Sequence, residues 1–444
     1  MHIFPQLRKL EKKYEGELAV IGVHSAKFPS EQETENVRMA ILRYEIGHPV
    51  VNDGEFQVWQ SYACRAWPTL MFLDPEGRVL GKHEGELPYE AFDRLLSDMV
   101  KAFDAQGRLD RRPLEYRREA LESAPLSFPG KVLADEANGR LFISDTSHNR
   151  ILQTTLDGEV TRTIGGVTPG FQNGDFVLAE FDHPQGMALD GNSLYVADTE
   201  NHAIRRVDLE EGYVETVTGT GEQAGSGSSG GKLKGTALNS PWDLTLHNGS
   251  VYIAMAGPHQ LWRLDLAKKQ VGPYAGSGRE NIVDGPLASA QLAQPSGITT
   301  DGQRLYFSDS ETSSIRTADL ESGGWVGTIV GQGLFEFGDV DGTGPEVRLQ
   351  HPLGVEWYDG VLYVADAYNH KIKRVYPMTQ SAMTFLGTGT HGHEDGPGQS
   401  ATFYEPGGLS IAGGKLFIAD TNNHSVRVMD LETEEVRTLE IRGL

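Results

Sequence analysis

Three residues that could do chemistry stand within five positions of one another. They are Asp198, Asn201 and His202, in the stretch YVADTENHAIRRVDL of residues 195–209. A carboxylate, an amide and an imidazole can bind a metal ion, and an Asp with a His also forms part of many catalytic triads. The first question is therefore whether this trio is a reactive site or a structural element.

Copies of this stretch recur along the chain, and the repetition bears on that question. The carboxylate reappears in four further copies and the Asn-His pair in two of them, as Asp145, Asp309, Asp366, Asn369, His370, Asp420, Asn423 and His424. A catalytic residue is needed once, whereas a position repeated in every unit of a repeat protein serves packing. We therefore interpret these residues as structural repeat positions. We expect Asp and Asn to accept backbone N–H groups in the turn between two strands, and His to cap or pack that turn.

Three copies depart from the pattern. The third has Met255 in place of Asp, the fourth has Thr312-Ser313 in place of Asn-His, and the first has His148-Asn149 in the reverse order. Drift of this kind is typical of packing positions. We assign no catalytic residue, no metal ligand and no cofactor to these turns.

The region that carries the copies divides into six units of nearly equal length. Each unit begins near a proline, and successive prolines are 55, 57, 54, 57 and 54 residues apart: Pro129, Pro184, Pro241, Pro295, Pro352 and Pro406. An apolar strand follows each proline, then a turn with a glycine, then three strands rich in β-branched and aromatic residues. Four-stranded units of about 40–50 residues that repeat radially are typical of β-propeller blades. We predict a mainly β chain with a six-bladed β-propeller over residues 125–444, closed by packing of the first blade on the last.

The repeated pattern P-x-G…YVAD-x-x-NH-x-I resembles that of the NHL-repeat family of β-propellers, and the resemblance covers residues 125–444. It implies that function lies in the loops around the channel rather than in the repeated positions.

Residues 1–103 alternate between helix and strand. We expect helices over 3–15, 30–46 and 88–103, strands over 18–26 and 49–53, and a hairpin over 69–85. Ser30 with Glu33 predicts a capping box at the start of the second helix. This order of elements resembles a thioredoxin-like domain. Residues 104–124 are interpreted as a charged linker that holds a short surface helix.

The tripeptide Trp67-Pro68-Thr69 carries the most specific part of that resemblance. The resemblance implies a cis bond before the proline and a possible substrate face around it. Together the two regions resemble the NHL-repeat-containing proteins with an N-terminal thioredoxin-like domain. Cys64, the single cysteine, lies near this segment, but the resemblance places the reactive thiol elsewhere, so we interpret it as a half-buried bystander.

From the resemblance we expect the thioredoxin-like domain to lack its beginning in this sequence. The resemblance implies a central strand and a Cys-x-x-Cys motif just upstream of Met1. Without that strand, its two neighbours lose a ladder of hydrogen bonds, and each unpaired buried amide costs about 1–3 kcal/mol. We therefore expect the reading frame to extend upstream, with Met1 an internal methionine. The alternative is a redox-inactive remnant.

Composition excludes several classes of function. The formal net charge is −23, and residues 125–444 hold 41 acidic against 22 basic side chains, which argues against binding to nucleic acid. No apolar run approaches the roughly 18 residues of a membrane span. A single cysteine excludes an intrachain disulfide and is compatible with the cytoplasm, the location we predict. The arginines at 111, 112, 117 and 118 could form a basic patch, but docking onto acidic surface is the simpler interpretation.

These observations favour a non-enzymatic protein-binding scaffold. Its partner is an unknown protein with basic segments, held by the propeller loops, and the oligomeric state stays open. One alternative is a thiol–disulfide oxidoreductase, if an upstream Cys-x-x-Cys is restored. A second is a metal-dependent hydrolase or lyase of the propeller channel, with Asp243 and Glu356 as candidate ligands and residues 338–344 as a faintly calcium-like loop.

Overall fold

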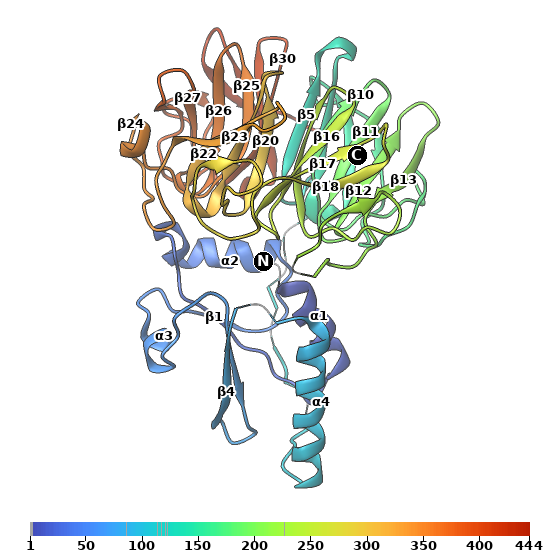
Figure 1. Cartoon of the computed structure of the whole chain (residues 1–444), viewed down its shortest axis with the longest axis vertical. Helices are drawn as coiled ribbons and strands as arrows, with labels where there is room; N and C mark the ends of the chain where they lie inside the picture. Colours follow the sequence, from blue (N-terminus) through green and yellow to red (C-terminus); the bar gives the residue numbers. More distant parts are fainter. Residues whose placement is uncertain are drawn as a thin grey trace. The chain divides into compact units, whose positions relative to one another are not determined.

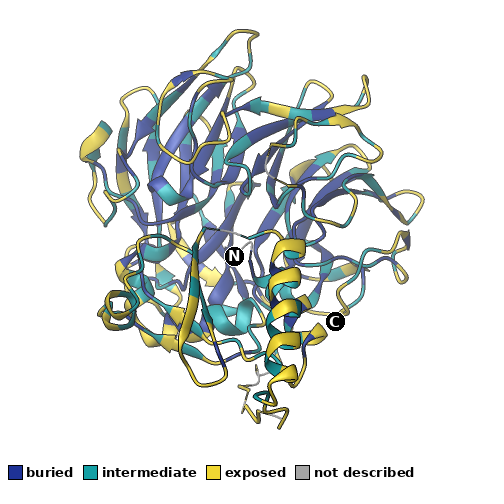
Figure 2. Cartoon of the chain, turned by 60° about the horizontal axis from the view of Figure 1, so that its bottom comes forward, coloured by how far each residue is buried: buried dark blue, intermediate teal, exposed yellow. Residues whose placement is uncertain are grey.

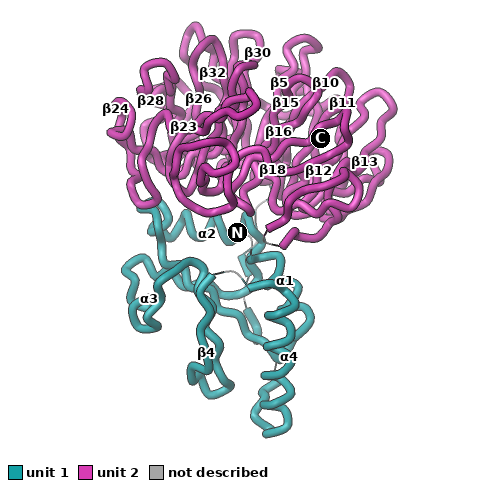
Figure 3. Tube along the Cα trace, in the orientation of Figure 1, with its two compact units in different colours: residues 1–123 teal, residues 124–444 magenta. Residues whose placement is uncertain are grey.

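The computed structural model describes residues 3–85, 87–112, 114–116, 118–119, 121, 123–225 and 227–444. The chain forms two compact units, residues 1–123 and 124–444, which are coloured separately in Figure 3. Met1 and Arg117, which enter the expectations above, lie outside the described residues. No helix in the described part of the chain is both long and apolar enough to cross a membrane.

The first unit contains four α-helices and four strands among its described residues (Figure 1). In chain order they are α1 (Phe4–Lys13), β1 (Gly22–His24), α2 (Thr34–Arg43), β2 (Val50–Asn52), α3 (Gln57–Ser61), β3 (Thr69–Leu73), β4 (Val79–Glu84) and α4 (Tyr89–Ala105). The alternation of helix and strand and the final hairpin and helix are therefore as expected. The observed strands are shorter than the sequence suggests.

The strands of this unit form two separate pairs rather than one sheet. β1 and β2 pair in parallel, and β3 and β4 pair antiparallel. The apolar core joins Leu10 and Tyr14 of α1 to Phe92 and Leu96 of α4, with partly buried side chains of β3 against them. This packing follows from the apolar stripe on each helix.

The predicted capping box at Ser30 and Glu33 is wrong. Pro29 opens a short 3₁₀ turn over Pro29–Gln32, because proline suits the first turn of a helix. The carboxylate of Glu31 accepts the backbone N–H groups of Lys27 and Phe28, at 3.0 and 3.1 Å. The α-helix α2 therefore begins only at Thr34.

The segment after α4 belongs to the first unit and forms no helix in its described residues. Its arginines pair with carboxylates of that unit. Arg111 contacts Glu17 at 2.8 Å and Asp104 at 2.7 Å, and Arg112 pairs with Asp110. Each of the two arginines therefore has an acidic partner within the first unit.

The second unit is a six-bladed β-propeller, with one sheet to each blade (Figure 1). Blade one has four strands: β5 (Lys131–Asp135), β6 (Arg140–Asp145), β7 (Arg150–Thr155) and β8 (Val160–Ile164). Blade two has β9 (Gly174–Asp175), β10 (Pro184–Asp190), β11 (Ser193–Asp198), β12 (Ala203–Asp208) and β13 (Tyr213–Thr218). Blade three has β14 (Gly231–Lys232), β15 (Pro241–His247), β16 (Ser250–Met255), β17 (Gln260–Asp265) and β18 (Gln270–Ala275).

The other three blades repeat this order. Blade four has β19 (Gly285–Pro286), β20 (Pro295–Thr300), β21 (Arg304–Asp309), β22 (Ser314–Asp319) and β23 (Trp325–Val330). Blade five has β24 (Gly342–Thr343), β25 (Pro352–Tyr358), β26 (Val361–Asp366), β27 (Lys371–Tyr376) and β28 (Ser381–Leu386). Blade six has β29 (Gly396–Pro397), β30 (Pro406–Ala412), β31 (Lys415–Asp420), β32 (Ser425–Asp430) and β33 (Glu435–Thr438).

The four-strand prediction for each blade is therefore incomplete for blades two to six. In each, two residues of the glycine-rich connector pair with the outermost strand and add a short fifth strand. The predicted hairpin glycines all have positive φ, between 57° and 86°: Gly139, Gly191, Gly249, Gly302, Gly360 and Gly413. Buried residues follow the strands of the blades, and exposed residues concentrate in the loops (Figure 2).

Closure of the ring uses more than the predicted packing. Apolar side chains of blades one and six do share one core cluster, which includes Leu141 and Phe417. In addition, the C-terminal segment runs beside the outer strand of blade one. The Val160 N–H donates to the Arg442 carbonyl at 2.8 Å, and the Arg442 N–H donates to the Gly158 carbonyl at 3.0 Å. Hydrogen bonds between blade turns, described below, complete the closure.

Candidate functional site

The Asp of the repeated turn is fully buried and fully engaged, as blade two shows. Asp198 Oδ1 accepts the backbone N–H of Asp182 at 2.8 Å. Its Oδ2 accepts Asn201 Nδ2 at 2.9 Å and Arg205 Nη1 at 2.8 Å. Burial raises the pKa of Asp198 to about 6, although these partners oppose the rise, so the carboxylate is ionised at neutral pH. It has no free oxygen to offer a metal or a substrate.

The backbone N–H that the carboxylate accepts comes from outside its own turn, contrary to the expectation from sequence. In each of the five blades that have it, Oδ1 accepts the N–H of the residue two positions before the blade proline, at 2.6 to 2.8 Å: Ser127, Asp182, Ala293, Gln350 and Tyr404. The incoming chain passes beside the turn, and this contact was not visible in the local sequence. The carboxylate therefore holds the entry of each blade.

The Asn of the repeat also differs from expectation, because its backbone partner is a carbonyl, to which the amide donates, rather than an N–H group. Asn201 Nδ2 donates to the carbonyl of Gly170 at 2.6 Å, a residue in the connector that precedes the blade. Asn369 and Asn423 do the same to Gly338 and Gly392, at 2.6 and 2.7 Å. Each amide also bonds the Asp of its own turn. The Asn therefore ties the connector to the turn.

The His of the repeat joins each blade to the next. His202 Nδ1 accepts the N–H of Ser240 at 3.0 Å, and His370 Nδ1 accepts that of Glu405 at 3.2 Å. His424 Nδ1 accepts the N–H of Phe128 at 3.1 Å and so links blade six to blade one. The donor in each case is the residue just before the next blade proline.

The three copies that depart from Asn-His make the same bond, one with a histidine and two with another acceptor. Asn149 Oδ1 receives the N–H of His183, His259 Nδ1 that of Gln294, and Ser313 Oγ that of His351, at 3.0 to 3.2 Å. All six acceptor residues have left-handed backbone, with φ between 48° and 54°. The drift in sequence therefore preserves one contact. An imidazole accepts at Nδ1 only when that nitrogen carries no proton, and burial lowers the pKa of His370 to about 4.

A second set of residues in the turn was missed by the sequence reading. Seven positions after the Asp, four blades carry a fully buried cation: Arg205, Arg316, Lys373 and Arg427. Arg205 reaches Asp198 and the carbonyls of Glu180 and Gln172, each at 2.8 Å. The cation thus clamps the connector under its blade. The fixed spacing of seven residues was a signal that could have revealed it.

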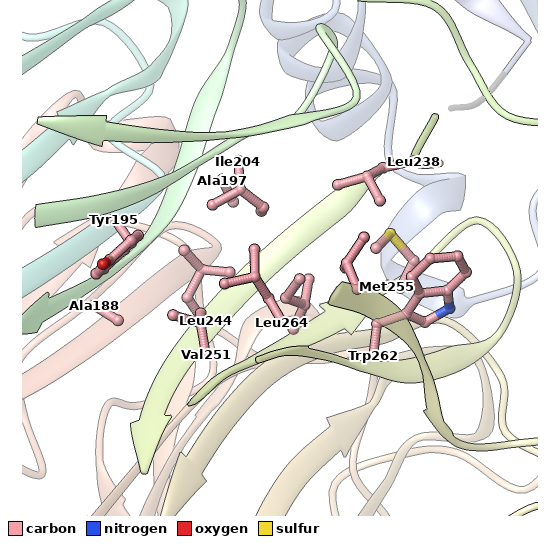
Figure 4. Packing of buried hydrophobic residues seen from close by; sticks show 12 residues of the cluster. Ala188, Tyr195, Ala197, Ile204, Leu238, Leu244, Val251, Met255, Trp262 and Leu264 are labelled. Carbon is pink, nitrogen blue, oxygen red and sulfur yellow. The ribbon is translucent and has the colours of Figure 1, made fainter. Parts of the chain in front are cut away.

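Blade three replaces this polar clamp with an apolar one. Met255 stands at the Asp position and Trp262 at the cation position, and both are buried in one core cluster. Figure 4 shows the Met255 thioether next to the Trp262 indole. Sulfur–aromatic contacts of this kind are favourable. The indole N–H donates to Gln260 Oε1 at 2.9 Å, so its polar atom is satisfied.

The innermost strands of all six blades enclose a central cavity of about 480 Å³. Its lining begins at the second or third residue after each blade proline and reaches the hairpin turn of blade one, where Glu136 and Ala137 are exposed. The cavity therefore opens on the side of these hairpins. A pocket of this size falls within the range of about 300–1,000 Å³ that is typical of ligand sites.

The inner end of the cavity is a narrow throat. The second residue after the proline is glycine in four blades and a charged residue in two: Lys131, Gly186, Asp243, Gly297, Gly354 and Gly408. A Cβ on Gly186 would lie 2.2 Å from Asp243 Oδ1, and one on Gly408 would lie 2.6 Å from Lys131 Cα. The blades therefore meet backbone to backbone at the throat.

The two charged residues of the throat neutralise each other. Lys131 Nζ donates to Asp243 Oδ2 at 2.8 Å and to the Ser296 carbonyl at 3.1 Å. The same carboxylate accepts the Ile298 N–H at 3.2 Å. The ammonium group occupies the place where a metal ion would have to approach Asp243, so the first predicted channel ligand is already engaged.

The second predicted channel ligand, Glu356, lies in the wall of the cavity. Burial raises the pKa of Glu356 to about 8, and nearby Asp243 adds to the rise; hydrogen bonds from the Ile411 N–H and the Thr299 hydroxyl oppose it. Its carboxyl group is therefore mostly protonated at neutral pH. Among the described residues, no basic side chain forms an ion pair with it.

The calcium-like loop of residues 338–344 holds lysines instead. Asp339 pairs with Lys371 and Lys373, and Asp341 contacts Lys373 Nζ at 2.7 Å. Among the described residues, one group of three side chains has ligand atoms close enough for a metal ion: Asp182, His183 and Glu200. In that group His183 Nδ1 lies 2.7 Å from Asp182 Oδ1.

The predicted face of the first unit is aromatic. The Trp67–Pro68 peptide bond is cis. The Trp67 ring packs against Trp59 at a tilt of 33°, with 4.5 Å between centroids, and its Nε1 donates to the Ser25 carbonyl at 2.7 Å. Thr69 donates its hydroxyl to the Ala66 carbonyl at 2.6 Å. Cys64 is a free, half-buried thiol.

Comparison with known proteins adds to this picture. The NHL repeat model matches residues 181–206 and 403–429, which span the repeated turns of blades two and six. The chain is 44% identical to the protein SUPPRESSOR OF QUENCHING 1, chloroplastic, of Arabidopsis thaliana, over 100% of this chain and 44% of that protein. It is 41% identical to NHL repeat-containing protein 2 of Homo sapiens, over 99% of this chain and 66% of that protein. The bovine protein of the same name is also 41% identical, over 98% of this chain and 65% of that protein.

The chain thus spans between 44% and 66% of the length of these relatives. The matched repeats coincide with the turns that link blade to blade. The second unit is accordingly a six-bladed propeller built from NHL repeats.

Proposed function

We propose that the chain is a non-enzymatic protein-binding scaffold whose propeller binds a basic segment of a partner protein. The observation that carries this proposal is the full engagement of the repeated polar side chains. The Asp and cation of the turn bond each other, and the His or its substitute bonds the next blade. The propeller as a whole is acidic, with 41 acidic against 22 basic residues in 125–444. Opposite charge would steer a basic segment to it.

The metal-dependent hydrolase or lyase is the weaker candidate. Such an enzyme needs free carboxylates in the channel, but Lys131 holds Asp243, and Glu356 keeps its proton at neutral pH. The group of Asp182, His183 and Glu200 stands outside the cavity lining. Elemental analysis of the purified protein tests this alternative, because one tightly held metal ion per chain would favour it over the scaffold.

We also propose that the first unit is thioredoxin-like. The order of its elements, the parallel pair β1–β2 and the antiparallel pair β3–β4 support this assignment. Two-cysteine exchange requires two thiols, and this chain has one cysteine. With dithiothreitol as the reductant, insulin disulfides are therefore expected to be reduced no faster with this chain than without it. Faster, catalysed reduction would favour the oxidoreductase alternative. A cytoplasmic location stays a prediction.

The scaffold proposal is tested with labelled peptides and the full chain. We expect a twelve-residue peptide rich in Lys and Arg to bind, as followed by fluorescence anisotropy, and its affinity to fall as salt rises because the Debye length shortens to about 8 Å at 0.15 M. A peptide of the same length rich in Asp and Glu is the control. Equal binding of both peptides, or binding of neither, would overturn the proposal.

A further inference from the structure

The central cavity has a polar wall, an apolar wall and a closed inner end. Thr245, Thr299, Glu356 and Ser410 line it together with Leu133, Ala188 and Leu246. The Lys131–Asp243 pair lies at the throat, where the glycine backbones meet. Leu133 and Ala188 stand four residues after their blade prolines, at the same level as the four polar residues. A group that enters from the hairpin side therefore meets apolar side chains of blades one and two on one side and polar side chains of the other blades on the other.

The ionisable groups of the lining that remain without a basic partner are carboxyl groups. Lys131 and Asp243 balance each other, and Asp135 is bound by Arg140 at 2.6 Å. Two carboxyl groups of the lining then have no basic partner among the described residues. They belong to Glu356 in the wall and to the exposed Glu136 at the rim. A cation is the ligand that complements such a wall.

We propose that this cavity receives one basic side chain of the partner segment, with its ammonium or guanidinium group on Glu356 and its methylene stem against Leu133, Ala188 and Leu246. Long basic side chains are suited to this, because their stems bury against apolar surface while the charged end finds a polar partner. The inference rests on the proposed scaffold function and names the site and the chemistry that it uses.

Binding of a cation at Glu356 changes the protonation of that residue. The free carboxyl group is mostly protonated at neutral pH because it is buried, and an arriving cation favours the carboxylate. The carboxyl O–H bond therefore breaks on binding, the proton passes to the buffer, and the carboxylate pairs with the cation. No other group is oxidised, reduced or transferred.

The test is calorimetry on the full chain with a short glycine- and alanine-rich peptide that carries one Arg. The matched probe replaces Arg by citrulline, which has nearly the same shape and no charge. At pH 7.0, titration in two buffers of different ionisation enthalpy should show release of about one proton for each peptide bound, and the release should fade towards pH 9, where the free carboxyl is already ionised. The citrulline peptide should bind at least about tenfold more weakly.

Two variants locate the effect. Glu356→Gln copies the neutral carboxyl group, so it should fold as the wild type and lose the proton release together with at least about tenfold in affinity. Asp359→Asn removes one negative charge from the hairpin of the same blade, outside the cavity lining, and should bind as the wild type. Because the buffer comparison uses the wild type, it stands even if Glu356→Gln folds poorly.

The outcomes separate this inference from the scaffold proposal. Equal affinity for the Arg and citrulline peptides, absence of proton release, or unchanged binding by Glu356→Gln would overturn the cavity site. If the longer basic peptide still bound with salt-sensitive affinity, the scaffold proposal would survive that result. If no basic peptide bound at all, both would fall.

Discussion

Blades two and three solve one structural problem in opposite ways. In blade two, Asp198 and Arg205 are fully buried and bond each other, the blade entry and the connector. In blade three, Met255 and Trp262 fill the same two positions without a charge. The two pairs occupy matching places, because each lies diagonally across the second and third strands of its blade.

The difference teaches that the pair, rather than either residue, is the unit of the repeat. A buried charge without its partner is strongly destabilising, whereas replacement of both partners by packed apolar groups is often neutral. In blade three, the Asp position and the cation position both hold apolar residues. Its connector, residues 219–231, is rich in Gly and Ser.

The largest effect is expected when one half of the polar pair is removed. Arg205→Met leaves the carboxylate of Asp198 buried without a counter-charge, so the free energy of unfolding should fall by about 3–5 kcal/mol. Urea unfolding measures the loss. The neighbouring Arg206→Met is the control, because Arg206 is partly exposed and pairs with Glu215 at the surface; it should cost at most about 1 kcal/mol. Equal losses in both variants would contradict the comparison.

Transplanting the apolar pair into blade two should cost less than breaking the polar one. The double variant Asp198→Met/Arg205→Trp leaves no charge in the core, so it should be more stable than Arg205→Met alone. The coupling between the two substitutions, measured by a double-mutant cycle in urea, should be favourable by about 1–3 kcal/mol. Strict additivity of the two single changes would show that the residues act independently.

Acid should weaken the bonds between blades. The pKa of His370 is about 4 in the fold, below the usual value of 6.5, so its contribution is present above pH 6.5 and is lost as pH falls from 6.5 towards 4. The loss amounts to at most about 3 kcal/mol at this site. His370→Asn should unfold with a smaller change between pH 7 and pH 4.5, because Asn149 makes the same bond in blade one without titrating. An unchanged pH dependence would contradict this role of the imidazole.

The smallest effect concerns a hydroxyl that only some blades possess. Thr199 Oγ1 donates to the Pro241 carbonyl of the next blade at 2.7 Å, whereas blades three and five have Ala256 and Ala367 at this place. Thr199→Ala should therefore cost about 0.5–1.5 kcal/mol, measured as a shift in the urea midpoint. A loss as large as that of Arg205→Met would mean that this hydroxyl, rather than the ion pair, joins the blades.

The propeller was predictable because its signals are periodic. The prolines at fixed intervals and the hairpin glycines specify six sheets, and each glycine has the positive φ that the turn requires. The partners of the turn residues were not predictable, since Asp198 bonds Asp182 and His202 bonds Ser240, and such contacts depend on how the chain folds back.

Only part of the channel could be predicted from the sequence. Asp243 and Glu356 were recognised as unusual at their repeat positions, but the lysine that neutralises Asp243 comes from a blade 112 residues away. The short fifth strands were missed because two-residue segments of Gly-rich connector carry no strand signal.

The central claim is that the repeated Asp, Asn and His residues hold the ring, whereas Glu356 meets the partner. The most direct measurement compares His202→Ala and Glu356→Gln for both urea stability and binding of the single-Arg peptide at pH 7. The account predicts that His202→Ala loses stability and keeps its affinity, and that Glu356→Gln keeps its stability and loses affinity. A folded His202→Ala protein that no longer bound the peptide would contradict the claim.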